Sequence, residues 1–212
     1  MYREGTGWQK LQPPSTPPAR AWTRGVWLDG KLWVFGGRGA AGTMNDLWAY
    51  DPASGAWEQR AVSSPDKPAP RYVHAMAACG GRIYVHGGSQ VIGNTGVPVP
   101  DLWAYDPASD AWTRRADGQA LYDHELVAVG GLLYTFGGGT SSSGSTTADV
   151  WVYDPARDAW NRLGKLGAWP AGRYAHAMCA GSDGSVYVLG AFQTGVWQEF
   201  WRLRPGFVAP ER

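Results

Sequence analysis

Four short segments of the chain bring arginine, tyrosine and histidine together at a fixed spacing. They read Arg71-Tyr72-Val73-His74, Leu121-Tyr122-Asp123-His124 and Arg173-Tyr174-Ala175-His176, with a divergent copy at Arg20-Ala21-Trp22-Thr23. Guanidinium groups bind carboxylates and phosphates through paired hydrogen bonds. Three converging imidazoles can hold a metal ion and leave one coordination position open. These residue types therefore allow either an anion-binding site or a metal site.

The same pattern has a purely structural interpretation. Polar side chains that recur in every unit of a repeat protein can satisfy loop carbonyls and neighbouring units instead of a ligand. Asp123 and Glu125 flank His124 in one copy only, which makes them the best candidates for a general acid or base. Neighbours in a strand point to opposite faces, so neither is expected to act with His124, although Asp123 and Glu125 share a face. The sequence contains no phosphate loop, nucleophile elbow or HExxH motif.

These segments belong to repeats that cover nearly the whole chain. An apolar run ends in a glycine pair at Gly36-Gly37, Gly87-Gly88 and Gly137-Gly138, and in Gly190-Ala191 in the last copy. The period is about 50 residues, and each run is followed by an acidic, tryptophan-containing segment that ends in a turn. Short aromatic or β-branched runs between turn residues predict β-strands. The pattern predicts four strands per repeat, which is one propeller blade.

A third motif is a tryptophan eleven residues after the leading Asp of the acidic segment, at Trp57, Trp112 and Trp160. The three motifs, in constant order and spacing, resemble the Kelch repeat. The resemblance implies an all-β, four-bladed Kelch-type β-propeller that forms a single domain over residues 1–212. The blades are expected at about 20–60, 71–114, 121–163 and 173–205. Four blades are fewer than Kelch propellers usually have, so half of an eight-bladed dimer and a fragment of a longer protein are the alternatives.

The two ends of the chain suggest how the ring closes. The last repeat stops after its third strand, and a spare strand-like segment with Trp8 precedes the first repeat. We therefore expect residues 5–12 to add the missing strand to the last blade, which removes an exposed sheet edge.

The resemblance also implies where a ligand binds. With the strands of a blade named a to d outward from the axis, the b–c loops and d–a segments form the face that binds partners in Kelch proteins. The b–c loops are expected at 38–45, 89–100, 139–148 and 192–198. The candidate ligand-binding residues on this face are Arg20, Arg38, Arg71, Tyr72, Tyr122, Arg173 and Tyr174. The candidates for a metal ion are His74, His124 and His176, although we expect no cofactor.

Two functions are compatible with this reading. The first is a propeller that binds a protein, a peptide or a small anionic ligand on the loop-bearing face. The alternative is a small Kelch-fold enzyme, a lyase, isomerase or cyclase with or without a metal, whose site lies at the mouth of the central channel. We expect a monomer, with a dimer that forms a larger ring as the alternative.

Composition excludes other partners. The net charge is +1 and no Lys/Arg cluster stands out, which predicts no binding to nucleic acid. No apolar stretch approaches the roughly 20 residues that span a bilayer. The start of the chain does not resemble a signal peptide, so we expect a cytoplasmic protein. Cys79 and Cys179 are expected to be buried thiols in strands.

Overall fold

The computed structural model of the protein describes residues 7–62, 64–93, 95–165, 167–191 and 198–206. Short alternating runs bounded by turn residues fold as β-strands, and every paired strand is antiparallel to its neighbour. This part of the chain contains no helix, and hence none that is long and apolar enough to cross a membrane.

Each repeat forms one sheet. The first sheet contains β1 (Arg24–Leu28), β2 (Lys31–Gly39), β3 (Gly42–Asp51) and β4 (Ala56–Arg60). The second contains β5 (Ala75–Cys79), β6 (Arg82–His86), β9 (Leu102–Asp106) and β10 (Ala111–Arg115). The third contains β11 (Glu125–Val129), β12 (Leu132–Phe136), β13 (Val150–Asp154) and β14 (Ala159–Arg162). The fourth has three strands, β15 (Ala177–Ala180), β16 (Val186–Leu189) and β17 (Phe200–Leu203). A separate hairpin, β7 (Ser89–Ile92) and β8 (Thr95–Pro98), is inserted between β6 and β9.

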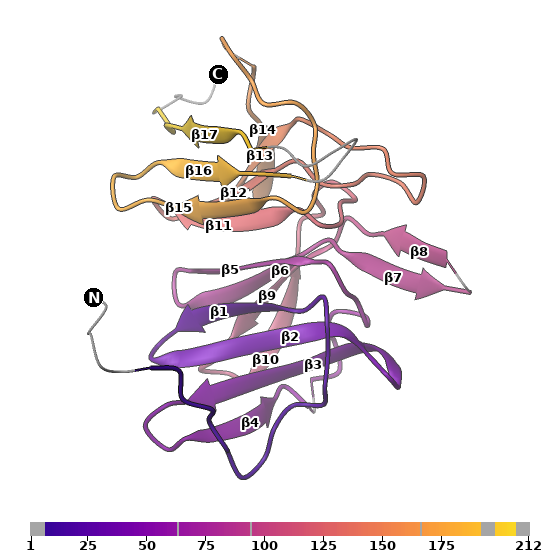
Figure 1. The fold of residues 1–212 in the computed structure, drawn as a ribbon, viewed down its shortest axis with the longest axis vertical. Coiled ribbons are helices and arrows are strands. Elements are labelled where there is room, and N and C mark those ends of the chain that lie inside the picture. Colours follow the sequence, from indigo (N-terminus) through magenta and orange to yellow (C-terminus); the bar gives the residue numbers. More distant parts are fainter. Residues whose placement is uncertain (1–6, 63, 94, 166, 192–197, 207–212) are drawn as a thin grey trace.

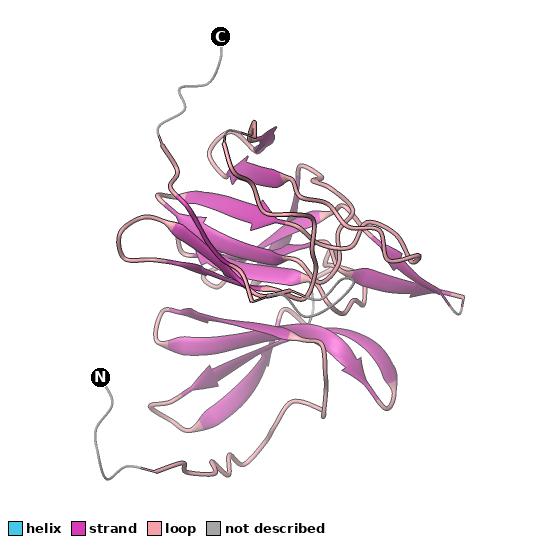
Figure 2. Ribbon diagram, turned by 45° about the horizontal axis from the view of Figure 1, so that its top comes forward, coloured by secondary structure: helices cyan, strands magenta, loops and turns pink. Residues whose placement is uncertain are grey.

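The four sheets are the blades of a propeller. Their inner strands β1, β5, β11 and β15 lie next to one another in chain order, and the sheets fan out from them (Figures 1 and 2). Three apolar clusters fill the spaces between successive blades. The cluster between the first two blades includes Trp33 and Phe35 on one side and Ile83 and Tyr105 on the other. The predicted all-β, four-bladed Kelch-type propeller is confirmed.

The glycine pair at the end of each second strand joins one blade to the next. Its second glycine donates its backbone N–H to the segment that precedes the inner strand of the following blade. These bonds run from Gly37 N to Arg71 O (2.9 Å), from Gly88 N to Leu121 O (2.7 Å) and from Gly138 N to Arg173 O (2.7 Å). Both glycines of these pairs have positive φ. A side chain does not fit there, since a Cβ on Gly88 would lie 2.7 Å from the Cβ of His74.

Successive blades are also connected by a second backbone hydrogen bond, which lies closer to the propeller axis. Trp22, Val73, Asp123 and Ala175 occupy the same position in the four repeats, and their φ angles lie between 48° and 55°. The bonds run from Val73 N to Trp22 O (3.0 Å), from Asp123 N to Val73 O (2.8 Å) and from Ala175 N to Asp123 O (2.9 Å). A left-handed conformation costs a non-glycine residue about 1–2 kcal/mol. These bonds between blades hold the four residues in it.

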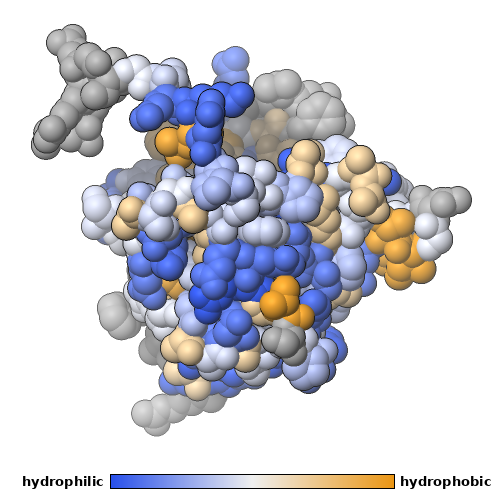
Figure 3. Space-filling model, turned by 90° about the horizontal axis from the view of Figure 1, so that it is seen from below, coloured by the Kyte–Doolittle hydropathy of each residue, from blue (hydrophilic) through white to orange (hydrophobic). Residues whose placement is uncertain are grey.

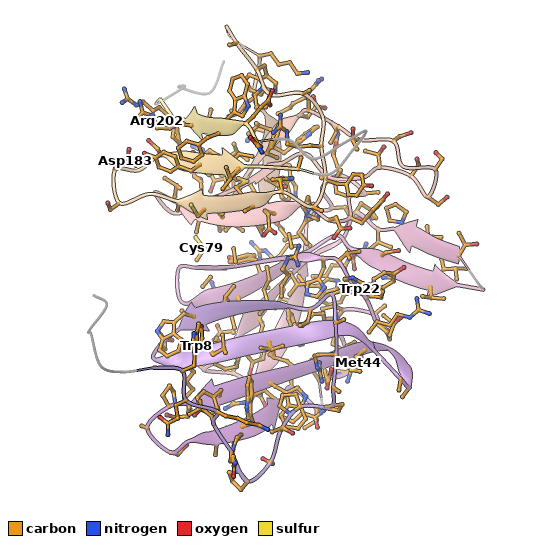
Figure 4. All side chains as sticks on the ribbon, in the orientation of Figure 1. Trp8, Trp22, Met44, Cys79, Asp183 and Arg202 are labelled. Carbon is orange, nitrogen blue, oxygen red and sulfur yellow. The ribbon has the colours of Figure 1, made fainter. Side chains whose placement is uncertain are left out.

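The predicted closure by residues 5–12 is wrong for the part that the structure describes. Residues 7–12 belong to no strand, and the side chain of Trp8 is fully exposed. The following segment runs along the first blade instead, where the Ser15 hydroxyl donates to the Trp57 carbonyl (3.2 Å). Trp8 consequently lies beside the first blade, while Arg202 of β17 lies at the far end of the molecule (Figure 4). Residues 5 and 6 lie outside the described residues.

Two smaller expectations also need correction. The first b–c connection is not a long loop, because β2 and β3 extend to a tight turn at residues 40–41, with a bulge between Phe35 and Gly37. The second contains the β7–β8 hairpin. Cys79 is buried as expected, but Cys179 is exposed, because no described residue covers that face of the last blade.

The glycine pair gives a direct test of the blade junction. We expect Gly88→Ala to lower the free energy of unfolding by about 2–4 kcal/mol, because it adds a steric clash to a left-handed conformation. Gly81→Ala is the matched control. Gly81 also has positive φ (72°), but an added Cβ would meet no atom within 4 Å, so only about 1 kcal/mol should be lost. Urea unfolding of both variants measures the difference, and equal losses would contradict the proposed role of the pair.

Candidate functional site

One face of the propeller carries the longer connections. The β2–β3 turn, the β7–β8 hairpin and residues 139–148 lie on the right in Figure 1, and the tight turns of the β1–β2 and β15–β16 hairpins lie on the left. We call the right-hand side the loop face. The fourth predicted b–c loop falls almost entirely on residues 192–197, which lie outside the described residues.

Three of the four candidate arginines are held inside their own blades. Arg71 is fully buried and grips the Asp101 carboxylate with two hydrogen bonds of 2.7 and 2.6 Å. Its other N–H groups donate to the carbonyls of Ala69 and Gly87. Arg20 binds Asp46 with two hydrogen bonds in the same way, and Arg173 donates one hydrogen bond to the Glu199 carboxylate. That these arginines contact a ligand stays a prediction, and the structure gives each of them protein partners.

A tryptophan completes each network. The Trp103 indole N–H donates to the Asp101 carboxylate at 2.7 Å, as Trp48 does to Asp46 and Trp201 to Glu199. Burial alone would raise the pKa of Asp101, but the hydrogen bonds from Arg71 and Trp103 hold that pKa below its usual value. The carboxylate is therefore ionised at neutral pH and belongs to the scaffold.

The third blade shows what happens when the arginine is missing. Leu121 stands where the other blades have arginine, and Asp149 pairs with Arg162 at 2.7 Å instead. The Trp151 indole nitrogen is then buried without a hydrogen-bond partner. The aspartate and tryptophan of the motif thus depend on the arginine of the same repeat for their geometry.

The candidate histidines lie in the spaces between blades and do not share one metal-binding point. His74 packs against Phe35 (ring centroids 5.4 Å apart), and His176 packs against Phe136 (5.5 Å). The His124 Nε2 lies 2.9 Å from the His86 Nδ1, so one ring nitrogen donates its proton to the other. Among the residues described, no three His, Cys, Asp or Glu side chains are arranged to hold a metal ion.

Burial also sets the protonation state of these histidines. It lowers the pKa of His74 and His124 well below the usual value, and it lowers the pKa of His86 and of His176 to about 4. All four imidazoles are therefore neutral at pH 7. They fill the junctions between blades as flat, weakly polar rings.

Aromatic side chains form the part of the loop face that is closest to the axis. Trp22 and Tyr72 are in contact, with ring centroids 5.7 Å apart, and Tyr122 and Tyr174 form a second pair at 6.1 Å. The guanidinium of Arg38 lies 5.8 Å from the centroid of the Tyr72 ring. The three tyrosines are half-buried, whereas the side chains of Trp22 and Arg38 are exposed. Trp22 was not among the predicted site residues, although its aromatic type at a position otherwise held by Val73, Asp123 and Ala175 is a visible signal.

An ion pair crosses the axis below this aromatic group. Arg24 of the first blade lies 3.2 Å from Glu125 of the third. Burial raises the pKa of Asp123 and of Glu125, while the positive charge of Arg24 opposes the rise in both. Asp123 has a left-handed backbone and precedes β11, so the strand alternation from which a shared face with Glu125 was expected does not apply to it. Arg24 was not predicted. The sequence does carry a signal for this pair, because the residue that follows the histidine position is Arg24 in the first repeat and Glu125 in the third.

The β7–β8 hairpin extends the loop face outward. Its tip exposes Val91 and Ile92, the latter with 61% of its side chain accessible. Apolar atoms form a group at the right-hand edge of Figure 3, on the side where the hairpin projects in Figure 1. The loop face thus combines an apolar hairpin tip with the exposed side chains of Trp22 and Arg38.

The buried histidines predict a pH dependence of stability. Their pKa is lower in the folded than in the unfolded chain, so the unfolded chain binds more protons once the pH falls below about 6.5. His86→Phe introduces the residue that the first and third repeats carry at this position. Between pH 6.5 and 4 this variant should lose stability less steeply than wild type, by up to about 1.4 kcal/mol per pH unit. Urea unfolding across this range tests it, and an unchanged slope would show that His86 is not held neutral.

Comparison with known proteins agrees with this geometry. Residues 4–122 match the model of the KLHDC2/KLHL20/DRC7 Kelch-repeats domain, and residues 120–167 match that of the Kelch motif. The chain is 33% identical over 119 residues to the Rab9 effector protein with kelch motifs of Xenopus laevis. The aligned region covers 54% of this chain and 32% of the relative. It is 36% identical over 100 residues to human Kelch-like protein 33, which covers 47% of this chain and 17% of the relative.

A third relative covers more of the chain. Kelch-like protein 15 of Danio rerio is 29% identical over 149 residues, which are 60% of this chain and 24% of the relative. The chain spans no more than about a third of the length of these curated relatives. The first family match alone covers more than half of the chain, and the repeats, blades and glycine pairs agree with it. This chain belongs to the Kelch-repeat family.

Proposed function

We propose that this chain is a protein-binding propeller and that a protein or peptide partner docks on its loop face. The observation that carries the proposal is the exposed Trp22 beside Tyr72, with the Arg38 guanidinium over the same tyrosine ring. Tryptophan, tyrosine and arginine are the residue types that contribute most to protein–protein affinity. Here they lie together on a rigid scaffold, with Trp22 and Arg38 exposed and Tyr72 half-buried.

The relatives support a protein partner. One of them is described by name as an effector of Rab9, and others are Kelch-like proteins. Kelch-repeat homologues are protein-interaction propellers, so a protein or peptide is the partner class that we propose for this chain. The aromatic group of this chain supports the loop face as the docking surface that we propose.

The buried arginines and the exposed surface have separate roles in this proposal. In three of the four blades, Arg20, Arg71 or Arg173 connects the acidic residue at the third strand to the segment before the first strand. The surface is left to Trp22, Arg38 and the tyrosines. An acidic or aromatic side chain of a partner would complement Arg38 and Tyr72. A small anionic ligand is the second candidate, with Arg38 as its anchor, because Arg38 is the exposed arginine of this group.

The aromatic group can be tested without disturbing the fold. We expect Trp22→Ala to weaken the binding of peptides selected on the wild-type protein about 30-fold, the effect of losing roughly 2 kcal/mol at a hot spot. Alanine is tolerated in this backbone conformation, since Ala175 adopts it in the last blade. Fluorescence anisotropy of labelled peptides measures the affinity.

Trp27 provides the matched control. It is a second tryptophan of the first blade with a similar exposed fraction, 60% against 56% for Trp22, but it lies within β1 rather than on the loop face. Trp27→Ala should leave peptide affinity unchanged, and Arg38→Ala should reduce it. Equal affinities for wild type and Trp22→Ala would eliminate the loop-face site.

Arginine variants should act on stability instead. Arg71→Leu reproduces the residue found at position 121 of the third blade and leaves the Asp101 carboxylate without its main partner. We expect this change to lower the free energy of unfolding by about 3–5 kcal/mol. Adding Asp101→Asn should recover part of the loss, because the uncompensated charge is removed. A stable Arg71→Leu variant that no longer binds peptide would instead place Arg71 in the binding site.

A further inference from the structure

The first and last blades each leave one face of their sheet uncovered by described residues. In the first blade, Leu32, Val34 and Tyr50 are only half-buried and Trp27 is 60% exposed. The last blade exposes Leu189 (52%) and Phe200 (66%) on its opposite side. These are large apolar side chains on two flat sheet faces, which monomeric proteins rarely leave in contact with water.

The repeats identify what covers such faces elsewhere in the molecule. The positions of Leu32, Val34 and Tyr50 are held in the second blade by Ile83, Val85 and Tyr105, all fully buried against the preceding blade. The positions of Leu189 and Phe200 are held in the first blade by Phe35 and Leu47, which are buried against the following blade. The uncovered faces are therefore the two halves of one more blade junction.

Backbone groups at the same faces give the register of that junction. Within the described residues, the N–H of Trp22 and the carbonyl of Ala175 lack the axial bond that their equivalents make. The carbonyl of Arg20 and the N–H of Ala191 likewise lack the bond that the glycine pairs make at the other junctions. One donor and one acceptor are therefore available on each face. Each matches its counterpart on the other face, as the ends of a sheet-like ladder do.

We propose that two copies of this chain associate head to tail, with the last blade of each packed against the first blade of the other. Each uncovered face is then packed against a blade in the way that the equivalent faces are packed at the three junctions within the chain. The new interface therefore continues the existing series of blade junctions. Two such junctions related by a twofold axis along the channel close a ring of eight blades, within the size range of propellers. This assembly leaves the loop face free and is independent of the proposed function.

Solution mass provides the first test. Multi-angle light scattering over a dilution series should give twice the 22.9 kDa mass of the chain. Trp27→Glu or Leu189→Glu should each weaken association about 30-fold or more, because a charge is buried without a partner. The matched control is Ile92→Glu, which places the same charge at a residue of similar exposure (61%) on the hairpin and should leave the dimer intact. A wild-type monomer at every concentration, or a polymer of growing length, would overturn the proposal.

A crosslink tests the register and separates two ways of closing the ring. Cys179 is exposed on the last blade. Its equivalent in the second blade is Ala77, and the equivalent of Trp27 in the third blade is Ala128. Ala77 and Ala128 lie in one apolar cluster between those two blades, so Cys179 and residue 27 are expected to lie close together across the new junction. A short bis-maleimide should therefore join Cys179 of one copy to the cysteine of a Trp27→Cys variant in the other and give a covalent dimer on a denaturing gel. Adding Cys179→Ser should abolish the product. A crosslink within one chain would show that the chain closes its own ring and would overturn the two-copy assembly.

Discussion

The backbone hydrogen bonds between successive blades are the constraint on which the rest of the structure depends. A four-stranded sheet with two apolar faces cannot bury both by itself, so each blade needs a neighbour at a fixed distance and angle. Two bonds at each junction set that distance, one from a glycine pair and one between residues such as Trp22 and Val73 with left-handed backbone. The β-branched Val73 is poorly suited to this conformation, and its presence there shows how strongly the junction imposes it.

This constraint also explains the composition of the candidate site. Since the backbone of the axial position makes the bond, its side chain is free to differ between blades, and it is Trp22, Val73, Asp123 and Ala175 in turn. The same position is therefore restricted in its backbone but differs in chemistry from blade to blade, with Trp22 exposed and Val73 buried. Trp22, the exposed member of this set, is the one that belongs to the binding surface that we propose.

Most of the fold could be predicted from the sequence, because the repeats fix strand order and blade number together. The arginine networks were harder, since Arg71 and Asp101 are 30 residues apart and only their joint recurrence in a repeat suggests a pair. The third repeat makes this recurrence harder to recognise, because it keeps the aspartate (Asp149) but has Leu121 in place of the arginine. Closure by Trp8 was predicted from a matching motif alone. A motif indicates that a segment can form an outer strand, but which edge it reaches depends on the course of residues 13–20 along the first blade, and no local pattern specifies that course.

The ion pair between Arg24 and Glu125 shows how two repeats can be distinguished within a symmetric fold. Their equivalents, Ala75 and Ala177, are small and apolar, so the charges occur only in the first and third blades. Burial raises the pKa of Glu125, and its pairing with Arg24 opposes the rise, so each charge offsets the cost of the other's desolvation. The two side chains are mostly buried, with 28% and 22% of their surface exposed, and they are paired with each other. In the binding function that we propose, recognition depends on the exposed Trp22 and Arg38, neither of which forms an ion pair within the described residues.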